Sequence, residues 1–157
     1  ANAASATLNE SGEEVLDSER RQFLVVQLDE SDYAVEVERV REIVRMREPT
    51  TLPRTPDWLL GVLALRGEVV EVVDLRARLG LQAKPSDRKS RIIVLHGKGD
   101  RVTGVLVDAV REVFRVSGGE ILPADGLDLA AVSEMCRRED GFVSVIDFDR
   151  VFEFDHE

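Results

Sequence analysis

The sequence predicts an all-β fold with a few short helices. β-branched residues gather in short runs, turn residues separate the runs, and this pattern starts at Gln22 and continues to the end of the chain. Hydrophobic residues make up 43% of the chain and charged residues 33%, so the chain holds enough apolar material for a packed interior. A length of 157 residues suits one domain.

The chain divides into a tail and a domain. Residues 1–20 are small, polar and acidic, with few large apolar side chains to bury, and we expect a flexible tail there. Residues 21–157 form the predicted domain. Within it, residues 82–90 are polar and aperiodic, so we expect the chain to cross between two halves in this segment.

The first half begins with two strands and a short helix. FLVVQL at 23–28 and YAVEV at 33–37 are predicted strands on either side of an acidic turn at 29–32. The next apolar residues keep a helical spacing, which predicts one or two turns of helix. These residues are Val37, Val40, Ile43 and Val44.

A hairpin follows the proline loop. Arg-Gly at 66–67 interrupts two apolar runs at 59–65 and 69–75, and glycine supplies the positive φ that a tight reversal requires. Asp74 is placed to cap a short helix that ends near Gly80.

The second half of the domain has the same pattern of short apolar runs separated by turn residues. Further strands are predicted at 91–96, 101–108, 111–116 and 140–148, and a short helix ends the set. The total is roughly eight to ten strands, a number that commonly curls or splits into packed layers or barrels. No exact internal repeat is visible.

Charge and cysteine content exclude several functions. Lysine and arginine total 21 against 31 acidic residues, and the net charge of -10 repels nucleic acid and anionic lipid. No apolar run approaches the ~20 residues of a membrane span, and no signal peptide is evident, so we expect a cytoplasmic protein without membrane insertion. A single cysteine and two histidines offer no metal-ligand spacing, and we expect no cofactor.

No combination of residues predicts catalysis, and we expect that the chain is not an enzyme. His96 ends a predicted strand, so a structural position is the favoured interpretation over a general base. Cys136 lies beside Arg137 and Arg138, which could lower its pKa, although packing is the favoured role. The hairpin with Arg66 at its tip is more apolar than a half-exposed hairpin needs, so it is buried on both faces or meets a partner.

Four segments carry an ordered set of motifs, namely a proline loop, G-V-x-x-L-R-G, V-V-D-L-R and G-x-x-V-D-x-V. The segments are FLVVQLDESDYAVEVERVREIV, LPRTPDWLLGVLALRGEVVEVVDLRARLG, RIIVLHGKGDRVTGVLVDAVREVFRV and DGFVSVIDFDRVF. In this order the motifs resemble the CheW-like domain family, the adaptors that couple chemoreceptors to the histidine kinase CheA. The resemblance spans about residues 22–152.

This resemblance implies two small five-stranded SH3-like barrels packed side by side, with a shared hydrophobic core and a groove between them. It also implies two partners: the cytoplasmic hairpin tip of a chemoreceptor, and the regulatory domain of a CheA-type histidine kinase. The expected location is the cytoplasm, at membrane-bound chemoreceptor arrays.

The resemblance also implies partner-binding residues, although core packing is the favoured role for the valines. Three matching segments supply them: V-x-E-I, the hairpin motif whose arginine is tied to receptor coupling, and the strand pair that lines the groove. The residues are Val40, Glu42, Ile43, Gly61, Leu65, Arg66, Gly67, Val105, Asp108, Val110 and Val113.

The chain departs from the family pattern at three positions. Ala64 replaces the usual asparagine before L-R-G, Glu71 stands where proline is frequent, and Glu134 lies near a position where many members have glycine. Two alternatives to the adaptor remain. One is a CheW-like module that binds only receptor or only kinase, and the other is a small-barrel enzyme or ligand binder that uses the groove.

Overall fold

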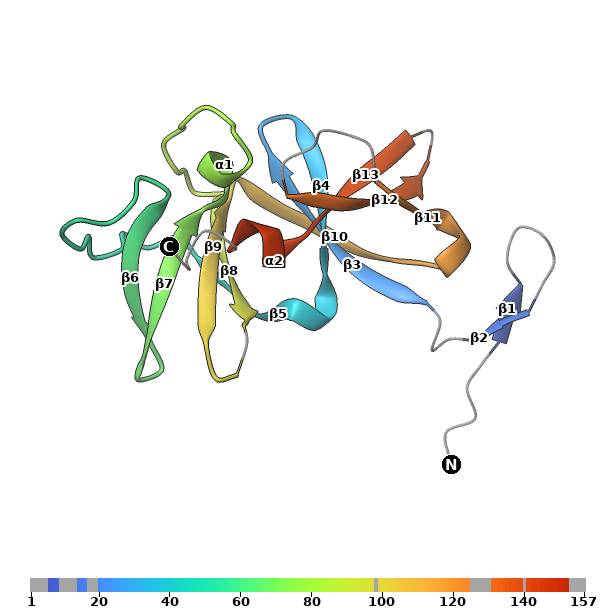
Figure 1. Cartoon of the computed structure of the whole chain (residues 1–157), viewed down its shortest axis with the longest axis horizontal. Helices are drawn as coiled ribbons and strands as arrows, with labels where there is room; N and C mark the ends of the chain where they lie inside the picture. Colours follow the sequence, from blue (N-terminus) through green and yellow to red (C-terminus); the bar gives the residue numbers. More distant parts are fainter. Residues whose placement is uncertain are drawn as a thin grey trace.

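The computed structural model describes residues 6–8, 14–16, 20–97, 99–124, 131–139 and 141–152. Two sheets dominate it (Figure 1). The five-stranded sheet, here the middle barrel, contains β5 (Val40–Arg45), β6 (Leu59–Leu65), β7 (Glu68–Asp74), β8 (Arg91–His96) and β9 (Val102–Val107). The six-stranded sheet, here the terminal barrel, contains β3 (Arg21–Leu28), β4 (Ser31–Glu36), β10 (Ala109–Val116), β11 (Ile121–Pro123), β12 (Val132–Arg138) and β13 (Gly141–Ile146).

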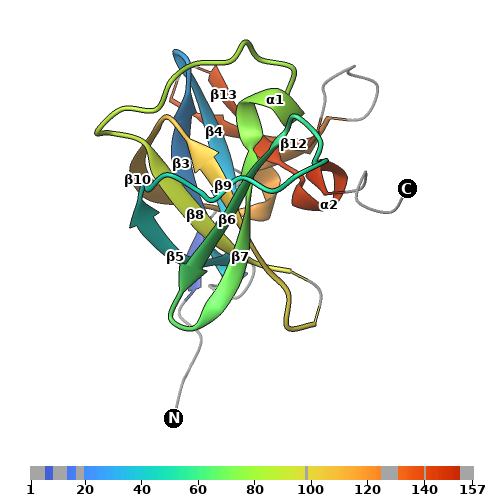
Figure 2. The same cartoon turned by 90° about the vertical axis from the view of Figure 1, so that its left-hand side faces the viewer.

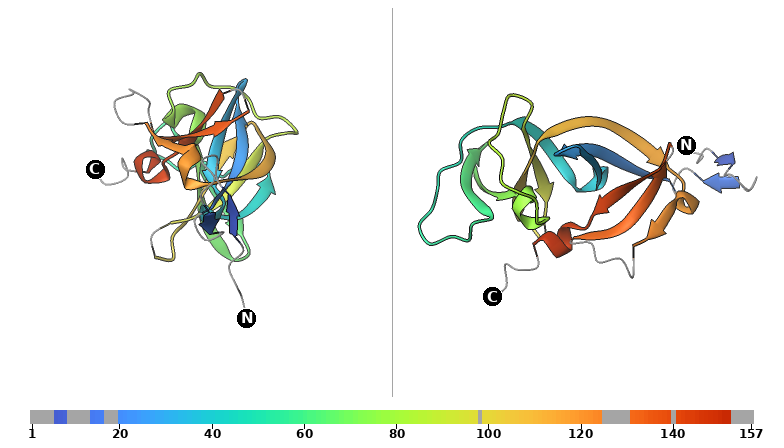
Figure 3. Two further views of the ribbon diagram at one scale, coloured as in Figure 1. Left: turned by 90° about the vertical axis from the view of Figure 1, so that its right-hand side faces the viewer. Right: turned by 90° about the horizontal axis from the view of Figure 1, so that it is seen from above.

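The predicted all-β class is confirmed, and the two barrels lie side by side along the longest axis (Figure 3, right). The strand order is β5-β8-β9-β7-β6 in the middle barrel and β10-β3-β4-β13-β12-β11 in the terminal barrel. The terminal barrel therefore has one strand more than the predicted five. Its extra strand, β11, is only three residues long and pairs with β12.

The predicted tail remains a prediction. Within residues 1–20, two short strands are described, β1 (Ala6–Leu8) and β2 (Glu14–Leu16), which pair antiparallel with each other. They lie apart from both barrels at the N-terminal end (Figure 1). The other positions before Arg20 are outside the described residues.

The segment 82–90, where the chain is expected to cross between two halves, does not connect the two barrels. This segment joins α1 (Leu75–Arg78) to β8, and both belong to the middle barrel. The chain enters the middle barrel through the 3₁₀ helix η2 (Val37–Arg39) and leaves it at Asp108. Residues 82–89 are exposed, so their polar composition reflects a surface loop rather than a boundary between barrels.

The helix predicted over 37–44 is wrong beyond its first turn. Only η2 is helical, and Val40, Ile43 and Val44 belong to β5. Every residue from Glu42 to Arg45 pairs in register with β8, and a β-bulge separates Val40 from Glu42. The bulge inserts one residue into the alternation, which explains why the apolar spacing imitates a helix.

The predicted hairpin and its following helix are confirmed (Figure 2). The strands β6 and β7 pair antiparallel up to Leu65 and Glu68. The Asp74 carboxylate accepts the Arg76 backbone N–H at 3.1 Å and caps α1, which ends before Gly80 with φ of +76°.

The core has three parts. The middle barrel encloses Leu63, Val72, Ile92 and Val94, and the terminal barrel encloses Phe23, Ala34, Val116, Cys136, Val143 and Val145. A larger cluster lies between the barrels, with Leu24, Val26, Leu28 and Val35 from one and Val73, Ile93, Leu95, Val105 and Val107 from the other. The helix α2 (Phe148–Val151) adds Phe148 and Val151 to it. This cluster is the shared core that the resemblance implies.

Candidate functional site

The hairpin tip presents an arginine to solvent. Arg66 and Gly67 both have positive φ, +50° and +81°, so the β6–β7 reversal is a tight turn. The Arg66 side chain is 75% exposed, whereas Leu65 packs against the middle-barrel core. The backbone therefore anchors Arg66 while its guanidinium projects outward.

Strand β5 holds this tip in place. Glu42 Oε1 lies 3.6 Å from Arg66 Nη2, and Arg41 Nη1 lies 2.6 Å from Glu68 Oε2. Arg47 Nη2 donates to the carbonyl of Ala64 at 3.2 Å, so an arginine from the neighbouring segment satisfies the turn in which alanine replaces asparagine. We call Glu42, Ile43, Arg66 and Gly67 the hairpin-tip surface; the Ile43 side chain in it is 41% exposed.

Two predicted site residues are buried and have structural roles. Gly61 has φ of +145°, and a Cβ there would lie 2.3 Å from the carbonyl oxygen of Thr50, so only glycine fits beside the Thr50–Val62 bridge. Val105 is fully buried in the shared core. Neither residue offers a surface to a partner.

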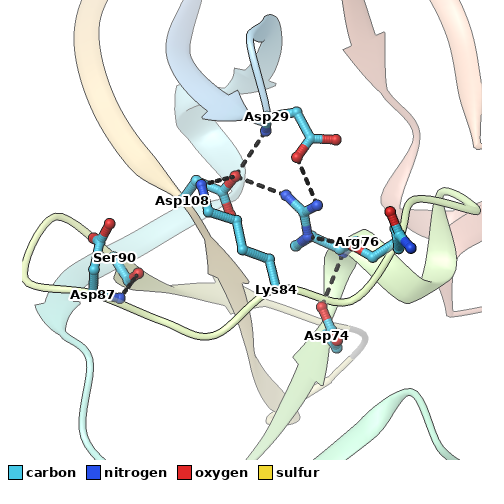
Figure 4. Close-up of polar contacts among 8 residues, drawn as sticks. Asp29, Asp74, Arg76, Lys84, Asp87, Ser90 and Asp108 are labelled. Carbon is cyan, nitrogen blue, oxygen red and sulfur yellow. Dashed lines mark hydrogen bonds and ion pairs between the residues drawn. The ribbon is translucent and has the colours of Figure 1, made fainter.

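Asp108 belongs to an ion cluster between the barrels (Figure 4). Its Oδ2 accepts the Asp29 N–H at 2.7 Å and lies 2.8 Å from Arg76 Nη1. Arg76 Nη2 lies 2.6 Å from Asp29 Oδ1, and its Nε donates to the carbonyl of Gln82 at 2.8 Å. Lys84 Nζ stands 3.8 Å from Asp108 Oδ2. Because the Arg76 side chain is only 6% exposed, this cluster fixes the middle-barrel helix to the β3–β4 turn.

The remaining predicted valines lie on β5 and β10. Val40 and Val110 are half-buried against the shared core. Val113 is 54% exposed and follows a β-bulge in the β10–β3 pairing. Of these three, Val113 alone is open to a partner.

Sequence reasoning missed an ion pair beside Val113 and an exposed aromatic residue on β13. Glu112 forms an ion pair with Arg138, and that guanidinium also lies 4.5 Å from the centroid of the Phe114 ring. The exposed Phe142 carries Arg137 at 5.9 Å from its ring centroid. We call Glu112, Val113 and Arg138 the Val113 surface. The outward position of Phe142 in the alternation of β13 was the available signal.

The two candidate chemical groups of the sequence, Cys136 and His96, both belong to strands. Cys136 is buried in the terminal-barrel core, and burial raises its pKa to about 11, despite the nearby charge of Arg21. The thiol is therefore protonated and unreactive at neutral pH, contrary to the activation considered from Arg137 and Arg138. The His96 carbonyl accepts from Arg39 Nε at 3.2 Å at the end of β8.

One surface hollow is lined by charged groups that already have structural partners. This hollow of about 290 Å³ includes Arg39, Asp147 and Asp149. Arg39 pairs with Asp149 at 3.5 Å, and Asp147 caps α2. Among the described residues, no three histidine, cysteine, aspartate or glutamate side chains are placed to hold a metal, and no helix is long and apolar enough to cross a membrane.

Known proteins match the whole domain. The model of the CheW-like domain matches residues 22–155. The chain is 32% identical over 136 residues to the chemotaxis protein CheW of Rhizobium meliloti, covering 84% of this chain and 87% of that protein. It is 32% identical over 114 residues to CheW of Klebsiella aerogenes, covering 73% and 68%.

A solved structure shares the architecture. The crystal structure of the scaffolding protein TtCheW from Thermoanaerobacter tengcongensis superposes with a TM-score of 0.81 at 27% identity, covering 87% of this chain and 95% of that one. The two barrels and their shared core are thus consistent with the match to the family model. This chain belongs to the CheW-like domain family.

Proposed function

We propose that this chain is a non-enzymatic adaptor of a chemosensory array, which couples chemoreceptors to a CheA-type histidine kinase in the cytoplasm. Its similarity to chemotaxis proteins over most of the chain supports this role. The observation that carries the proposal is the hairpin-tip surface, where Arg66 is exposed on a turn that the barrel holds rigidly.

The adaptor uses two separate surfaces. The hairpin-tip surface takes the helical hairpin tip of a receptor, and the Val113 surface takes the regulatory domain of the kinase. Each surface combines a charged pair with an exposed apolar side chain, Ile43 on one and Val113 on the other. Coupling requires different contacts in the two signalling states, and a shared core between the barrels transmits such differences without large deformation.

The charge reversal R66E tests the receptor surface. We expect it to weaken receptor binding by about tenfold or more, because a reversed charge meets the groups that attracted the arginine. Isothermal titration with a soluble receptor fragment measures the change. The matched control is R54E, because Arg54 is also an exposed arginine with positive φ, in the loop before β6. Equal affinity of R66E and the unchanged protein would remove Arg66 from the receptor surface.

A charge swap separates direct recognition from the internal ion pair. The double variant E42R/R66E restores a pair between the two side chains but reverses their positions. If the receptor contacts the Arg66 side chain directly, receptor binding stays weak in the double variant. Recovery of binding would mean that the pair acts only by holding the turn.

The variant V113E tests the kinase surface. We expect weaker binding of the kinase regulatory domain, because an exposed apolar contact would then bury a charge, and unchanged binding of the receptor. Titrating each partner separately also tests the alternative in which the chain binds only one of them. A protein that binds one partner alone is not a coupling adaptor.

A further inference from the structure

A group of arginines lies at one end of the middle barrel. Arg45 in β5 and Arg91 in β8 are directly opposite each other in the antiparallel register, so their side chains share one face of the sheet. With Arg88 they line a surface hollow of about 370 Å³. Like charges at such a position repel each other, which costs stability unless another group compensates.

No carboxylate of the described residues forms an ion pair with these arginines. Asp87 also lines the hollow, but its Oδ1 accepts the Lys89 N–H at 2.8 Å, and this hydrogen bond lowers its pKa. The Ser90 hydroxyl accepts the Asp87 N–H at 2.9 Å, so the 87–90 turn is fixed (Figure 4). The Arg91 Nη1 donates to the carbonyls of Arg88 and Ser90. The rest of the cationic surface faces solvent.

In the terminal barrel, the arginine at the position that matches Arg45 faces a hydrogen-bond acceptor. There, Val113 pairs with Leu24 and Arg115 with Gln22, as Ile43 pairs with Ile93 and Arg45 with Arg91 in the middle barrel. With its amide oxygen turned to the guanidinium, Gln22 accepts from Arg115 Nε at 2.9 Å and Nη2 at 3.1 Å. The middle barrel replaces this acceptor with a second arginine. A carboxylate from another molecule could therefore take the place of this acceptor.

We propose that Arg45, Arg88 and Arg91 bind a carboxylate-bearing segment of a partner protein. Guanidinium groups hold carboxylates through paired hydrogen bonds, and this basic hollow is an exception in a chain of net charge -10. Ile43 lies two positions before Arg45 on the same face of β5 and is exposed, so the site continues the hairpin-tip surface. The ligand is an acidic segment with an apolar side chain that reaches Ile43.

Labelled hexaglutamate is the probe, measured by fluorescence anisotropy on the full chain at low and at 0.15 M ionic strength. We expect binding that salt weakens, and a loss of about tenfold in affinity for R45E and for R91E, the size of effect that close charge pairs give. The control is R115E, the matching arginine of the terminal barrel, which should bind like the unchanged protein. R45E should also melt no lower than the unchanged protein, because a carboxylate then faces Arg91.

Three outcomes contradict the proposal. Hexaglutamate fails to bind, or R115E loses as much affinity as R45E, which would mean that only the general field acts. Inorganic phosphate binds in an R45E-sensitive manner while hexaglutamate does not, which would make the hollow a small-anion site. Because the probe contains neither receptor nor kinase, these results are independent of the proposed adaptor role.

Discussion

The two barrels share one arrangement of strands and helices but differ at particular residue positions. Each has a parallel strand pair, β7 with β9 and β13 with β4, and each follows one of these strands with an aspartate-capped helix of four residues. Each has a bulge at the matching strand, β5 or β10. The shared strand pairs, capped helices and bulges form the framework of both barrels. Positions at which the barrels differ are free to acquire a specific role.

A sequence repeat underlies this shared arrangement. VERVREIV at 37–44 and VDAVREVF at 107–114 share both valines and the Arg-Glu pair, and the two segments contain the matching bulges. The first two strands of each half of the sequence complete the barrel that is built mainly from the other half. The strands β3 and β4 belong to the terminal barrel, and β8 and β9 belong to the middle barrel. The two halves of the chain thus follow a similar strand pattern, and each contributes a hairpin to the barrel that contains most strands of the other half.

The largest expected difference concerns matching helix positions, Arg76 in α1 and Asp149 in α2. R76M removes the buried cation that joins Asp29 and Asp108 and leaves only the more exposed Lys84 nearby, so we expect a loss of about 3 kcal/mol in the free energy of unfolding. Urea denaturation measures it. D149N should stay within about 0.5 kcal/mol, because that side chain is 73% exposed. Similar losses for both variants would contradict the role of the ion cluster.

The next difference concerns Gly61 and Glu134, which occupy matching places because they pair with Val72 and Val145. We expect Gly61→Ala to cost about 2 kcal/mol, from the positive φ and the clash with Thr50. Glu134→Ala loses the pairing with Arg21 at 2.9 Å and should cost about 1 kcal/mol. Thermal unfolding measures the stability of the two variants. A larger loss for Glu134→Ala than for Gly61→Ala would contradict the role given to the Gly61 backbone.

The barrel cores should differ in their response to alkaline pH. Cys136 in the terminal barrel matches Leu63 in the middle barrel, and its folded-state pKa is about 11 against 9.0 for a free thiol. The unfolded chain therefore releases its proton first, so the stabilisation present below pH 9 declines as the pH rises to about 11, by about 1–2 kcal/mol. Unfolding free energies measured across this range test it. C136A should lack this component while keeping the rest of the profile.

The smallest effects should come from the ion pairs of two matching glutamates, Glu42 with Arg66 and Glu112 with Arg138. Both pairs are partly exposed, so E42Q and E112Q should each change stability by less than about 1 kcal/mol. A double-mutant cycle on each pair gives the coupling energy. A much larger coupling in either pair would mean that it holds its barrel closed.

The sequence predicted local elements better than their assembly. The hairpin around Arg66, the Asp74 cap and the strand 91–96 could be predicted because turn chemistry and apolar runs act within a few residues. The bulge in β5 gave its residues a helix-like apolar spacing. The polar loop at 82–90 separates the two halves of the sequence but not the two barrels, because local composition reflects exposure rather than strand pairing. The strand β11 was missed because it has only three residues and ends in a proline, and β12 was missed because polar residues such as Ser133 and Arg137 leave it without an apolar run.

Part of the candidate site was also predictable. The exposure of Arg66 and Ile43 agrees with the surface expected for them, whereas Val105 and Gly61 are interior positions that share the same motifs. Motifs record what a family retains, and they do not separate contact from packing. Phe142 and Arg138 belong to no motif, and their position becomes clear only when β12 and β13 are paired.

The hairpin exchange has a consequence for how the adaptor fails. Since each barrel borrows two strands from the opposite half of the chain, neither barrel is complete without residues on both sides of the exposed loop at 82–90. A protease cut in that loop would leave two interlocked fragments rather than two working modules. Damage to either half should therefore disrupt both barrels at once.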